Sequence, residues 1–180
     1  MSDSRRQALI DHLMAHAVRT DGPFVLSSGA VSSWYIDARR TTFDGVGAAI
    51  VGAAVADVLP EDATAVGGLT MGADPVAVAT AMTVGAGLKA FSVRRTAKRH
   101  GTGGRIVGPV GPGDRAVLVE DTTTTGSSFA EAAAALEAEG IAVVAAVALV
   151  DRSDGAVTEM MRREGRAYLA LTTPADLGVE

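Results

Sequence analysis

Apolar and polar positions follow one another along the chain in blocks that predict strands and helices in turn. Short apolar runs, such as Ala116–Val119 and the ten-residue run Ile141–Val150, predict buried strands. Alanine-rich runs, such as Asp44–Leu59 and Ala130–Gly140, predict helices. Strands that alternate with helices indicate an α/β fold, with a mainly parallel sheet of four to five strands and helices on both faces.

Further elements follow from the same patterns: helices at Ser4–Val18, Val76–Val84 and Asp154–Glu164, and strands at Ala65–Gly68, Leu88–Val93 and Ala167–Leu171. Two short strands are expected around Ser27-Ser28-Gly29. No repeat, linker or low-complexity tract divides the chain, so residues 1–180 are predicted to form one domain.

Composition narrows the class of protein. A formal charge of −5 argues against a nucleic-acid binder, and the lack of cysteine fits a reducing compartment. The longest apolar run has ten residues, roughly half of what a bilayer requires, and no signal peptide is evident. We therefore expect a cytoplasmic protein that binds neither nucleic acid nor membrane.

Two adjacent carboxylates, Glu120 and Asp121, follow the run Ala116–Val119, and a hydroxyl-rich segment, Thr122–Ser128, follows them. Carboxylates at the end of a buried strand repel each other, so a cation, a metal ion or donated hydrogen bonds must compensate them. A sugar phosphate meets this need, because its hydroxyls suit the acids and its phosphate suits the N–H groups at a helix start. The plainer alternative is a helix cap beside an exposed acidic turn.

A second polar stretch places five potential cations within seven residues of an acidic chain: Arg94, Arg95, Lys98, Arg99 and His100. Glycines follow it, which favours a segment that closes over a departing anion. The alternative is a solvated run of charges. Because the chain also has a predicted phosphate-binding segment, we prefer the interpretation that the cationic stretch closes over an anion.

Two other patterns are interpreted as structural. His12 and His16 lie four residues apart on a predicted helix, but no third metal ligand is evident, so we expect ordinary surface histidines. Gly85–Ala90 matches a dinucleotide-binding pattern, yet it follows a helix and precedes a strand, which reverses the required order.

The run Val117-Leu-Val-Glu-Asp-Thr-Thr-Thr-Thr-Gly-Ser-Ser128 resembles the phosphoribosyl pyrophosphate signature of the type I phosphoribosyltransferases. Two further patterns resemble the orotate phosphoribosyltransferases in particular. One is Phe-x-Leu-x-Ser-Gly at residues 24–29, followed by Tyr-x-Asp-x-Arg at 35–39, which resembles their amino-terminal hood. The other is Arg-Arg-x-x-Lys-x-His-Gly at residues 94–101, which resembles their catalytic loop.

The resemblance implies a type I phosphoribosyltransferase fold, with a small hood formed mainly by about residues 1–40 and the C-terminal segment. It implies transfer of ribose 5-phosphate from phosphoribosyl pyrophosphate to orotate, giving orotidine 5′-monophosphate and pyrophosphate in pyrimidine biosynthesis. The implied cofactor is Mg²⁺, held mainly through substrate oxygens with no protein ligand assigned. The implied partner is a second copy of the chain, whose 94–104 loop completes the neighbouring site.

The resemblance also assigns roles to individual residues. The implied donor-binding residues are Arg94, Arg95, Lys98, His100, Glu120, Asp121, Thr122, Thr123, Thr124, Thr125, Gly126, Ser127 and Ser128. The implied catalytic residues are Lys98, His100, Arg94 and Asp121. The implied orotate-binding residues are Thr124 and Arg152. The loop at 69–75 corresponds to the segment that wraps the pyrophosphate.

This chain departs from the family pattern at three places where lysine is common. Ser27 precedes the Ser-Gly of the hood, Met71 and Gly72 occupy the place of a lysine in the 69–75 loop, and Arg95 stands in the cationic stretch. Two alternatives remain open. An adenine-type transferase would share the fold and donor site, and a non-catalytic regulator would sense the donor and bind RNA, although the acidic charge counts against the regulator.

Overall fold

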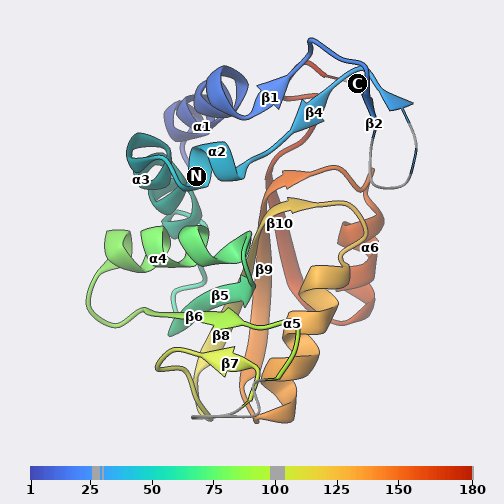
Figure 1. Cartoon of the computed structure of the whole chain (residues 1–180). Coiled ribbons are helices and arrows are strands. Elements are labelled where there is room, and N and C mark those ends of the chain that lie inside the picture. Colours follow the sequence, from blue (N-terminus) through green and yellow to red (C-terminus); the bar gives the residue numbers. More distant parts are fainter. Residues whose placement is uncertain (26–28, 30, 98–103, 180) are drawn as a thin grey trace.

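The computed structural model describes residues 1–25, 29, 31–97 and 104–179. Within this part, six strands form the central sheet in the order β10–β9–β8–β5–β6–β7 (Figure 1). They are β5 (Ala65–Leu69), β6 (Lys89–Val93), β7 (Ile106–Val107), β8 (Arg115–Thr123), β9 (Ala142–Asp151) and β10 (Ala167–Thr172). Neighbours pair in parallel except β7, which is antiparallel to β6. The predicted parallel α/β sheet is confirmed, but the predicted strand number was too low because two-residue β7 carries no hydrophobic pattern of its own.

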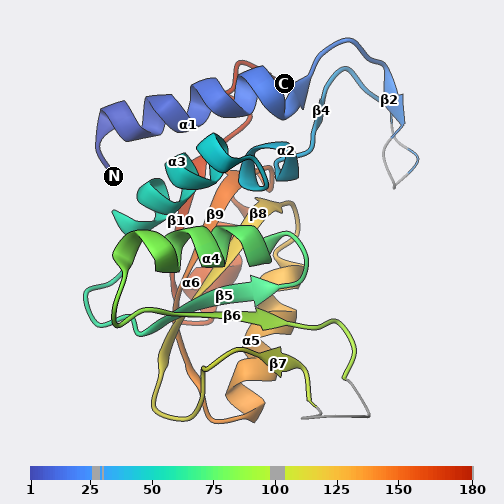
Figure 2. The ribbon, with the colours of Figure 1, turned by 60° about the vertical axis from the view of Figure 1, so that its left-hand side comes forward.

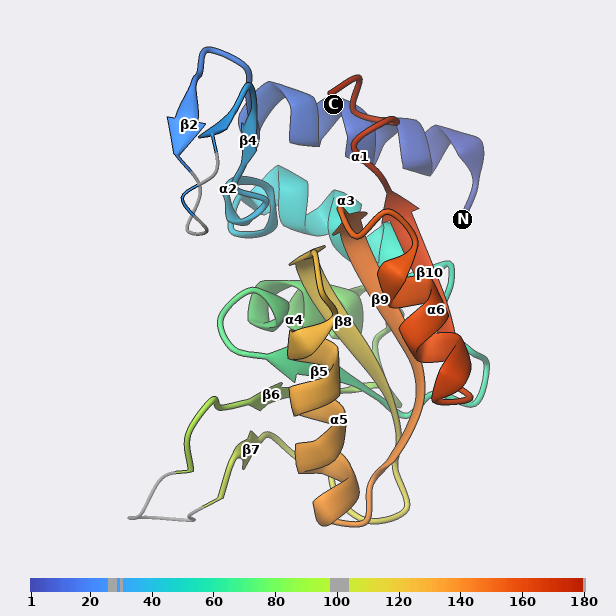
Figure 3. The ribbon, with the colours of Figure 1, turned by 90° about the vertical axis from the view of Figure 1, so that its right-hand side faces the viewer.

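Helices cover both faces of this sheet. In the described residues they are α1 (Asp3–His16), α2 (Arg39–Thr42), α3 (Gly45–Ala56), α4 (Ala73–Val84), α5 (Ser127–Ala138) and α6 (Ala156–Arg163). Asp44 caps the start of α3, because its Oδ1 accepts hydrogen bonds from the backbone N–H groups of Val46 and Gly47. Figures 2 and 3 show α4 on one face of the sheet and α5 on the other.

The two faces of the sheet build two cores. Along β8, Val117 and Val119 join the cluster that contains residues of α1, α3 and α4. Ala116 and Leu118 join the cluster that contains residues of α5 and α6. This split follows from the two-residue alternation of side chains along a strand, and it explains why the central strands are apolar at consecutive positions.

Two short antiparallel pairs lie over the carboxyl ends of the central strands (Figures 1 and 3). They are β1 (Val18–Arg19) with β4 (Tyr35–Ile36), and β2 (Phe24–Val25) with β3 (Val31–Ser32). We call residues 1–40 together with the segment after β10 the hood.

The segment after β10 is tied to α1. The Arg6 guanidinium donates to the Leu171 carbonyl at 3.2 Å and pairs with Asp176 at 2.7 Å. Leu177 and Val179 are buried in the same core as α1. No helix in the described part of the chain is both long and apolar enough to cross a membrane.

Candidate active site

The two acids predicted to bind a ligand lie at the carboxyl end of β8. Glu120 is 7% exposed, and its Oε2 atom has no hydrogen-bond partner among the described residues. Burial, with the neighbouring charge of Asp121, raises the pKa of Glu120 from 4.5 to about 8, a rise that its hydrogen bond with Ser128 opposes. Burial also raises the pKa of Asp121, although the Thr122 N–H donates to its Oδ1 at 2.7 Å. Such a pair favours a ligand that brings hydroxyl donors or positive charge.

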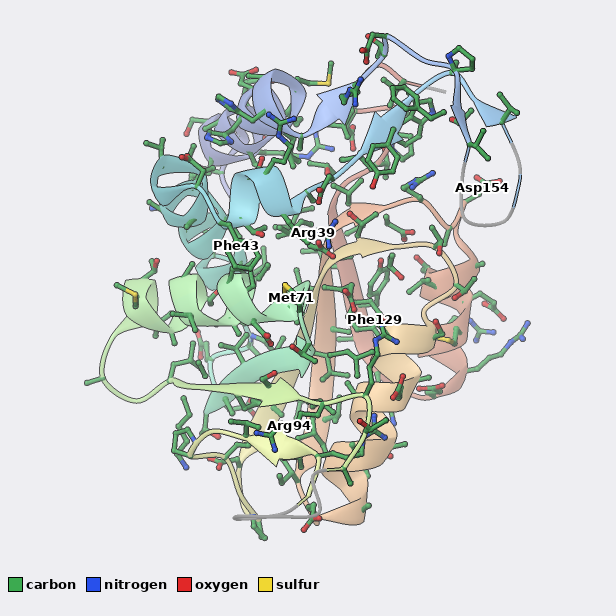
Figure 4. All side chains as sticks on the ribbon, viewed as in Figure 1. Arg39, Phe43, Met71, Arg94, Phe129 and Asp154 are labelled. Atoms are coloured by element: carbon green, nitrogen blue, oxygen red, sulfur yellow. The ribbon has the colours of Figure 1, made fainter. Side chains whose placement is uncertain are left out.

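A cleft of about 490 Å³ opens in front of these acids. Three segments far apart in the sequence meet there, the hood at residues 35–39, the loop at 69–72 and the strand end at 120–122, together with Arg95. Figure 4 shows Arg39 on the hood side of this region and Met71 on the side of α4. The cleft lies beyond the carboxyl ends of parallel strands, where ligands of open α/β sheets bind.

The loop at 69–72 contacts the acids with its backbone. A Cβ added to Gly72 would lie 2.5 Å from Asp121 Oδ1 and 2.9 Å from Glu120 Oε1, so a side chain at this position would displace the carboxylates. The Thr70 hydroxyl donates to Asp74 Oδ2 at 2.7 Å. Helix α4 begins at Ala73, three residues before the predicted start, and its first N–H groups therefore lie close to the cleft.

The hydroxyl-rich segment is more regular than predicted. Strand β8 continues through Thr123, and α5 already begins at Ser127, so the connection is shorter than the predicted loop. Gly126 makes this turn possible: its φ is +75°, and a Cβ would overlap the Met160 methyl group. The Ser127 N–H donates to Thr125 Oγ1 at 3.4 Å.

These hydroxyls differ in exposure. Thr124, Thr125 and Ser127 are exposed, Thr122 and Ser128 are half-buried, and Thr123 is buried in the strand. The exposed group surrounds the first turn of α5, which is the arrangement expected of a phosphate site.

The two residues predicted to bind orotate lie at neighbouring strand ends. The Arg152 backbone N–H donates to the Thr123 carbonyl at 2.9 Å, and Thr124 follows Thr123 directly. The Arg152 guanidinium stacks over the buried Trp34 ring of the hood, with its central carbon 4.6 Å from the ring centroid. The hood therefore holds one face of this arginine.

The cationic stretch is described only over its first four residues, 94–97. Arg95 lines the cleft and lies 3.8 Å from Glu131 of α5, which also pairs with Arg105. Arg94 is not among the residues lining the cleft; its backbone pairs with Arg105, beside β7 (Figure 4). Four residues singled out from the sequence lie outside the described residues: Ser27, Lys98, Arg99 and His100.

An orotate phosphoribosyltransferase of Streptomyces coelicolor is 42% identical to this chain over 184 residues, covering 100% of each. The chain belongs to the orotate phosphoribosyltransferase family. The resemblance and the type I fold predicted from the sequence are thereby confirmed, and the chain is an enzyme, a pentosyl-transferring glycosyltransferase.

Solved structures of this family match the whole fold. The crystal structure of Mycobacterium tuberculosis H37Rv orotate phosphoribosyltransferase in complex with Fe(III) dicitrate has a TM-score of 0.88 and 38% identity, covering 97% of this chain and 99% of that one. The same enzyme in complex with phosphoribosyl pyrophosphate has a TM-score of 0.83 and 35% identity, again covering 97% and 99%. No protein-family model matches the chain.

Sequence reasoning assigned residues 35–39 to the hood and the 69–75 loop to the pyrophosphate, but it committed to no individual role for several residues that line the cleft: Tyr35, Asp37, Arg39, Thr70 and Gly72. A signal for Tyr35 and Asp37 was present, because alternate positions of an extended segment point the same way, whereas Arg39 already begins α2. The Arg39 Nε and Nη2 atoms donate to the two oxygens of Asp37 at 2.7 and 3.2 Å.

Of the two patterns interpreted as structural, the structure confirms the turn at Gly85 and contradicts the predicted exposure of His12. Gly85 ends α4 and precedes β6, as predicted for a helix-to-strand turn. His12 is not the expected surface residue, because it is only 9% exposed. Its ring nitrogens lie 3.2 Å from the Thr41 hydroxyl and 3.2 Å from Asp44, so it packs α1 against the start of α3. No group of three or more potential metal ligands occurs among the residues that the structure describes.

Proposed function

We infer that this chain transfers ribose 5-phosphate from phosphoribosyl pyrophosphate to orotate, giving orotidine 5′-monophosphate and pyrophosphate. The observation that carries the proposal is the acid pair of buried Glu120 and half-buried Asp121, which lines the cleft and is joined to the first turn of α5 by the hydrogen bond between Glu120 and Ser128. The full-length relatives are named for this reaction, and one related crystal structure holds the donor. The product makes this a step of pyrimidine nucleotide synthesis.

The donor sugar lies against the acids in this proposal. Glu120 and Asp121 accept hydrogen bonds from the two ribose hydroxyls, and Asp121 acts as a catalytic residue because its charge favours the positive ring of an oxocarbenium-like transition state. The 5′-phosphate binds at the start of α5, where backbone N–H groups and hydroxyls converge. Its binding residues are Thr122, Thr123, Thr124, Thr125, Gly126, Ser127 and Ser128.

Orotate lies between Thr124 and Arg152. An arginine presents N–H groups in a planar fork that matches a carboxylate, and orotate carries one. Because Trp34 covers a face of the Arg152 guanidinium, the donor edge of the fork remains available to the base.

The leaving pyrophosphate gathers negative charge, which Arg94, Arg95, Lys98 and His100 neutralise in this proposal. Lys98 or His100 donates a proton to the leaving oxygen; Arg95 contributes charge only, because a guanidinium stays protonated. Mg²⁺ supplies further neutralisation when bound. The cleft fits a metal held mainly through substrate oxygens, since it offers the unpartnered oxygen of Glu120 while no cluster of three ligands occurs in the described residues.

The working unit is a homodimer in which the 94–104 loop completes the neighbouring site, and each chain is a single cytoplasmic domain with a hood. Mixing Lys98→Ala and Asp121→Asn subunits tests the shared site. If the loop crosses, random exchange restores about a quarter of wild-type sites, because half the dimers carry one intact site. Mixtures that stay inactive despite subunit exchange would argue that each chain uses its own loop.

The substrate test compares orotate with adenine, using the same donor and Mg²⁺. We expect product with orotate alone, since adenine has no carboxylate for Arg152. Product with adenine alone would favour a purine transferase, and RNA retained at moderate salt without any product would favour a regulator.

Lys98→Ala should lower turnover by about 10²–10³-fold, since it removes a cation aimed at developing charge. A loss of less than about threefold would exclude that role for Lys98.

A further inference from the structure

The described side chains around the cleft carry too little positive charge to neutralise the diphosphate of the donor proposed to bind there. Three acidic side chains line the cleft, those of Asp37, Glu120 and Asp121, of which Glu120 is mainly protonated near neutral pH because its pKa is raised to about 8. Within the described residues only two cations line it, Arg39 and Arg95. A diphosphate adds negative charge to this set. An anion placed beside carboxylates in a partly enclosed cleft requires cations close to it.

The loop that faces the acids offers no cation of its own. Its cleft-lining residues are Leu69, Thr70, Met71 and Gly72. Arg95 belongs to the cationic stretch, its side chain is 66% exposed, and it already lies 3.8 Å from Glu131. Arg39 is therefore the cation that the hood itself places in the cleft.

Arg39 is held in position while most of its donors remain available. Its Nε and Nη2 atoms donate to the two oxygens of Asp37, and its backbone N–H donates to Asp37 Oδ1 at 3.2 Å. A guanidinium carries five N–H donors, so three remain for another acceptor. The side chain is 49% exposed, which leaves it accessible from the cleft.

The position of Arg39 relative to the acids points to the same ligand. Its pKa is raised mainly by its hydrogen bonds with Asp37 and, to a smaller extent, by the charge of Asp121. The guanidinium thus lies within the electrostatic influence of the acid that is proposed to hold the ribose. The diphosphate group of the donor is attached to that same ribose ring.

We propose that Arg39 binds the diphosphate of the donor and retains the pyrophosphate as it leaves. This role rests on the proposed function. As the ribose C1–oxygen bond breaks, its electron pair stays on the leaving oxygen. The new bond forms between C1 and the orotate nitrogen, which releases its N–H proton to water. Arg39 stabilises the charge on the leaving group through hydrogen bonds and transfers no proton.

A matched set of variants tests this role. Arg39→Ala removes the cation, and Arg39→Lys keeps a charge without the planar fork. Arg40→Ala is the control, because Arg40 is the next residue, is exposed, does not line the cleft and changes the net charge equally. The readouts are the KM values for donor and orotate, and the calorimetric Kd values for pyrophosphate and for ribose 5-phosphate, all with Mg²⁺.

We expect Arg39→Ala to raise the donor KM and the pyrophosphate Kd by about 10- to 100-fold, the effect of losing charge-assisted hydrogen bonds. The orotate KM and the ribose 5-phosphate Kd should stay within about twofold, Arg39→Lys should recover part of the loss, and Arg40→Ala should match wild type. Thermal unfolding of each variant checks that Arg39→Ala remains folded; if it does not, Arg39→Lys and Arg39→Gln provide the comparison.

The inference is overturned if Arg39→Ala and Arg40→Ala give the same pyrophosphate Kd. It is also overturned if Arg39→Ala weakens ribose 5-phosphate and pyrophosphate equally, because Arg39 would then act on the whole cleft through its charge. Failure of the proposed function would look different: wild-type protein would form no product from orotate, whatever the pyrophosphate measurements show.

Discussion

The guanidinium carbon of Arg152 lies 4.6 Å from the centroid of the Trp34 ring, which joins the end of β9 to the hood. Trp34 is 7% exposed, and the Ser32 hydroxyl donates to its backbone carbonyl at 2.7 Å. A planar cation that stacks on an aromatic face loses rotational freedom but keeps its N–H edge. In the proposed function, this contact orients the arginine that recognises orotate.

Replacing Trp34 should therefore weaken orotate binding selectively. We expect Trp34→Ala to raise the orotate KM by about 2- to 30-fold, the range of a cation–π contact, with the donor KM within about twofold. Trp34→Phe should have a smaller effect. Phe43→Ala is the control, because Phe43 is an exposed aromatic residue outside the cleft lining (Figure 4). Equal increases in both KM values in a folded Trp34 variant would contradict a specific role.

Glu120→Gln should stabilise the free protein at alkaline pH while lowering its activity. Burial raises the pKa of Glu120 to about 8, so between its ordinary value of 4.5 and about 8 the folded state binds more protons than the unfolded state. The free energy of unfolding contributed by this group therefore falls as pH rises through that window and stays low above it. Glutamine cannot ionise and avoids this loss.

Thermal unfolding between pH 5 and pH 9 checks this prediction. The Tm difference between Glu120→Gln and wild type should grow with pH, by about 2–4 °C for each kcal/mol. Glu139→Gln, at an exposed glutamate, makes the same change in charge and serves as the control. A Tm difference that does not depend on pH would show that Glu120 is ionised at neutral pH in the folded protein.

Gly72→Ala should impair catalysis more than stability. The new Cβ would lie 2.5 Å from Asp121 Oδ1, so the carboxylate must move away from the ribose that it is proposed to hold. We expect kcat/KM for the donor to fall by about 10²-fold or more, as for other displaced groups that face developing charge. Gly45→Ala is the control, since nothing lies within 4 Å of a Cβ there. Unchanged kinetics in Gly72→Ala would show that the loop and the acids move independently.

Gly126→Ala should destabilise the protein for two separable reasons. Its φ of +75° is unfavourable for alanine, and the added methyl group would overlap Met160 of α6. Denaturation of Gly126→Ala, Met160→Ala and the double variant separates them. Met160→Ala should relieve the overlap, while about 1–2 kcal/mol of backbone cost remains. If the changes in the free energy of unfolding of the two single variants simply add up in the double variant, the overlap does not contribute to the destabilisation.

Local patterns predicted most elements and the acids at the end of β8. Hydrophobic periodicity located the strands and helices, and the order of apolar run, acids, hydroxyls and helix predicted a sugar-phosphate site. The predicted ends of the strands and helices were less accurate than their existence and order. Thr122 and Thr123 belong to β8 because they continue its pairing with β9, and no local pattern shows where such pairing ends.

Local sequence patterns could not predict which remote segments come together to form the site. Asp37 and Arg39 reach the acids because the hood lies over the carboxyl ends of the strands, and Gly72 reaches them because β5 is the neighbour of β8 in the sheet. The burial of His12 likewise depends on how α1 packs on α3. These contacts join segments that are remote in the chain.

The sequence by itself determined the alternation of strands and helices, the family and the chemical type of the donor site, because these depend on residues close together in the chain. Tertiary structure alone decided that Arg39 shares a cleft with Asp121 and that Trp34 supports Arg152. The physical reason is that strand order and the placement of the hood follow from burying both faces of the sheet at once. That requirement acts on the whole chain, so the resulting arrangement cannot be predicted from any single segment.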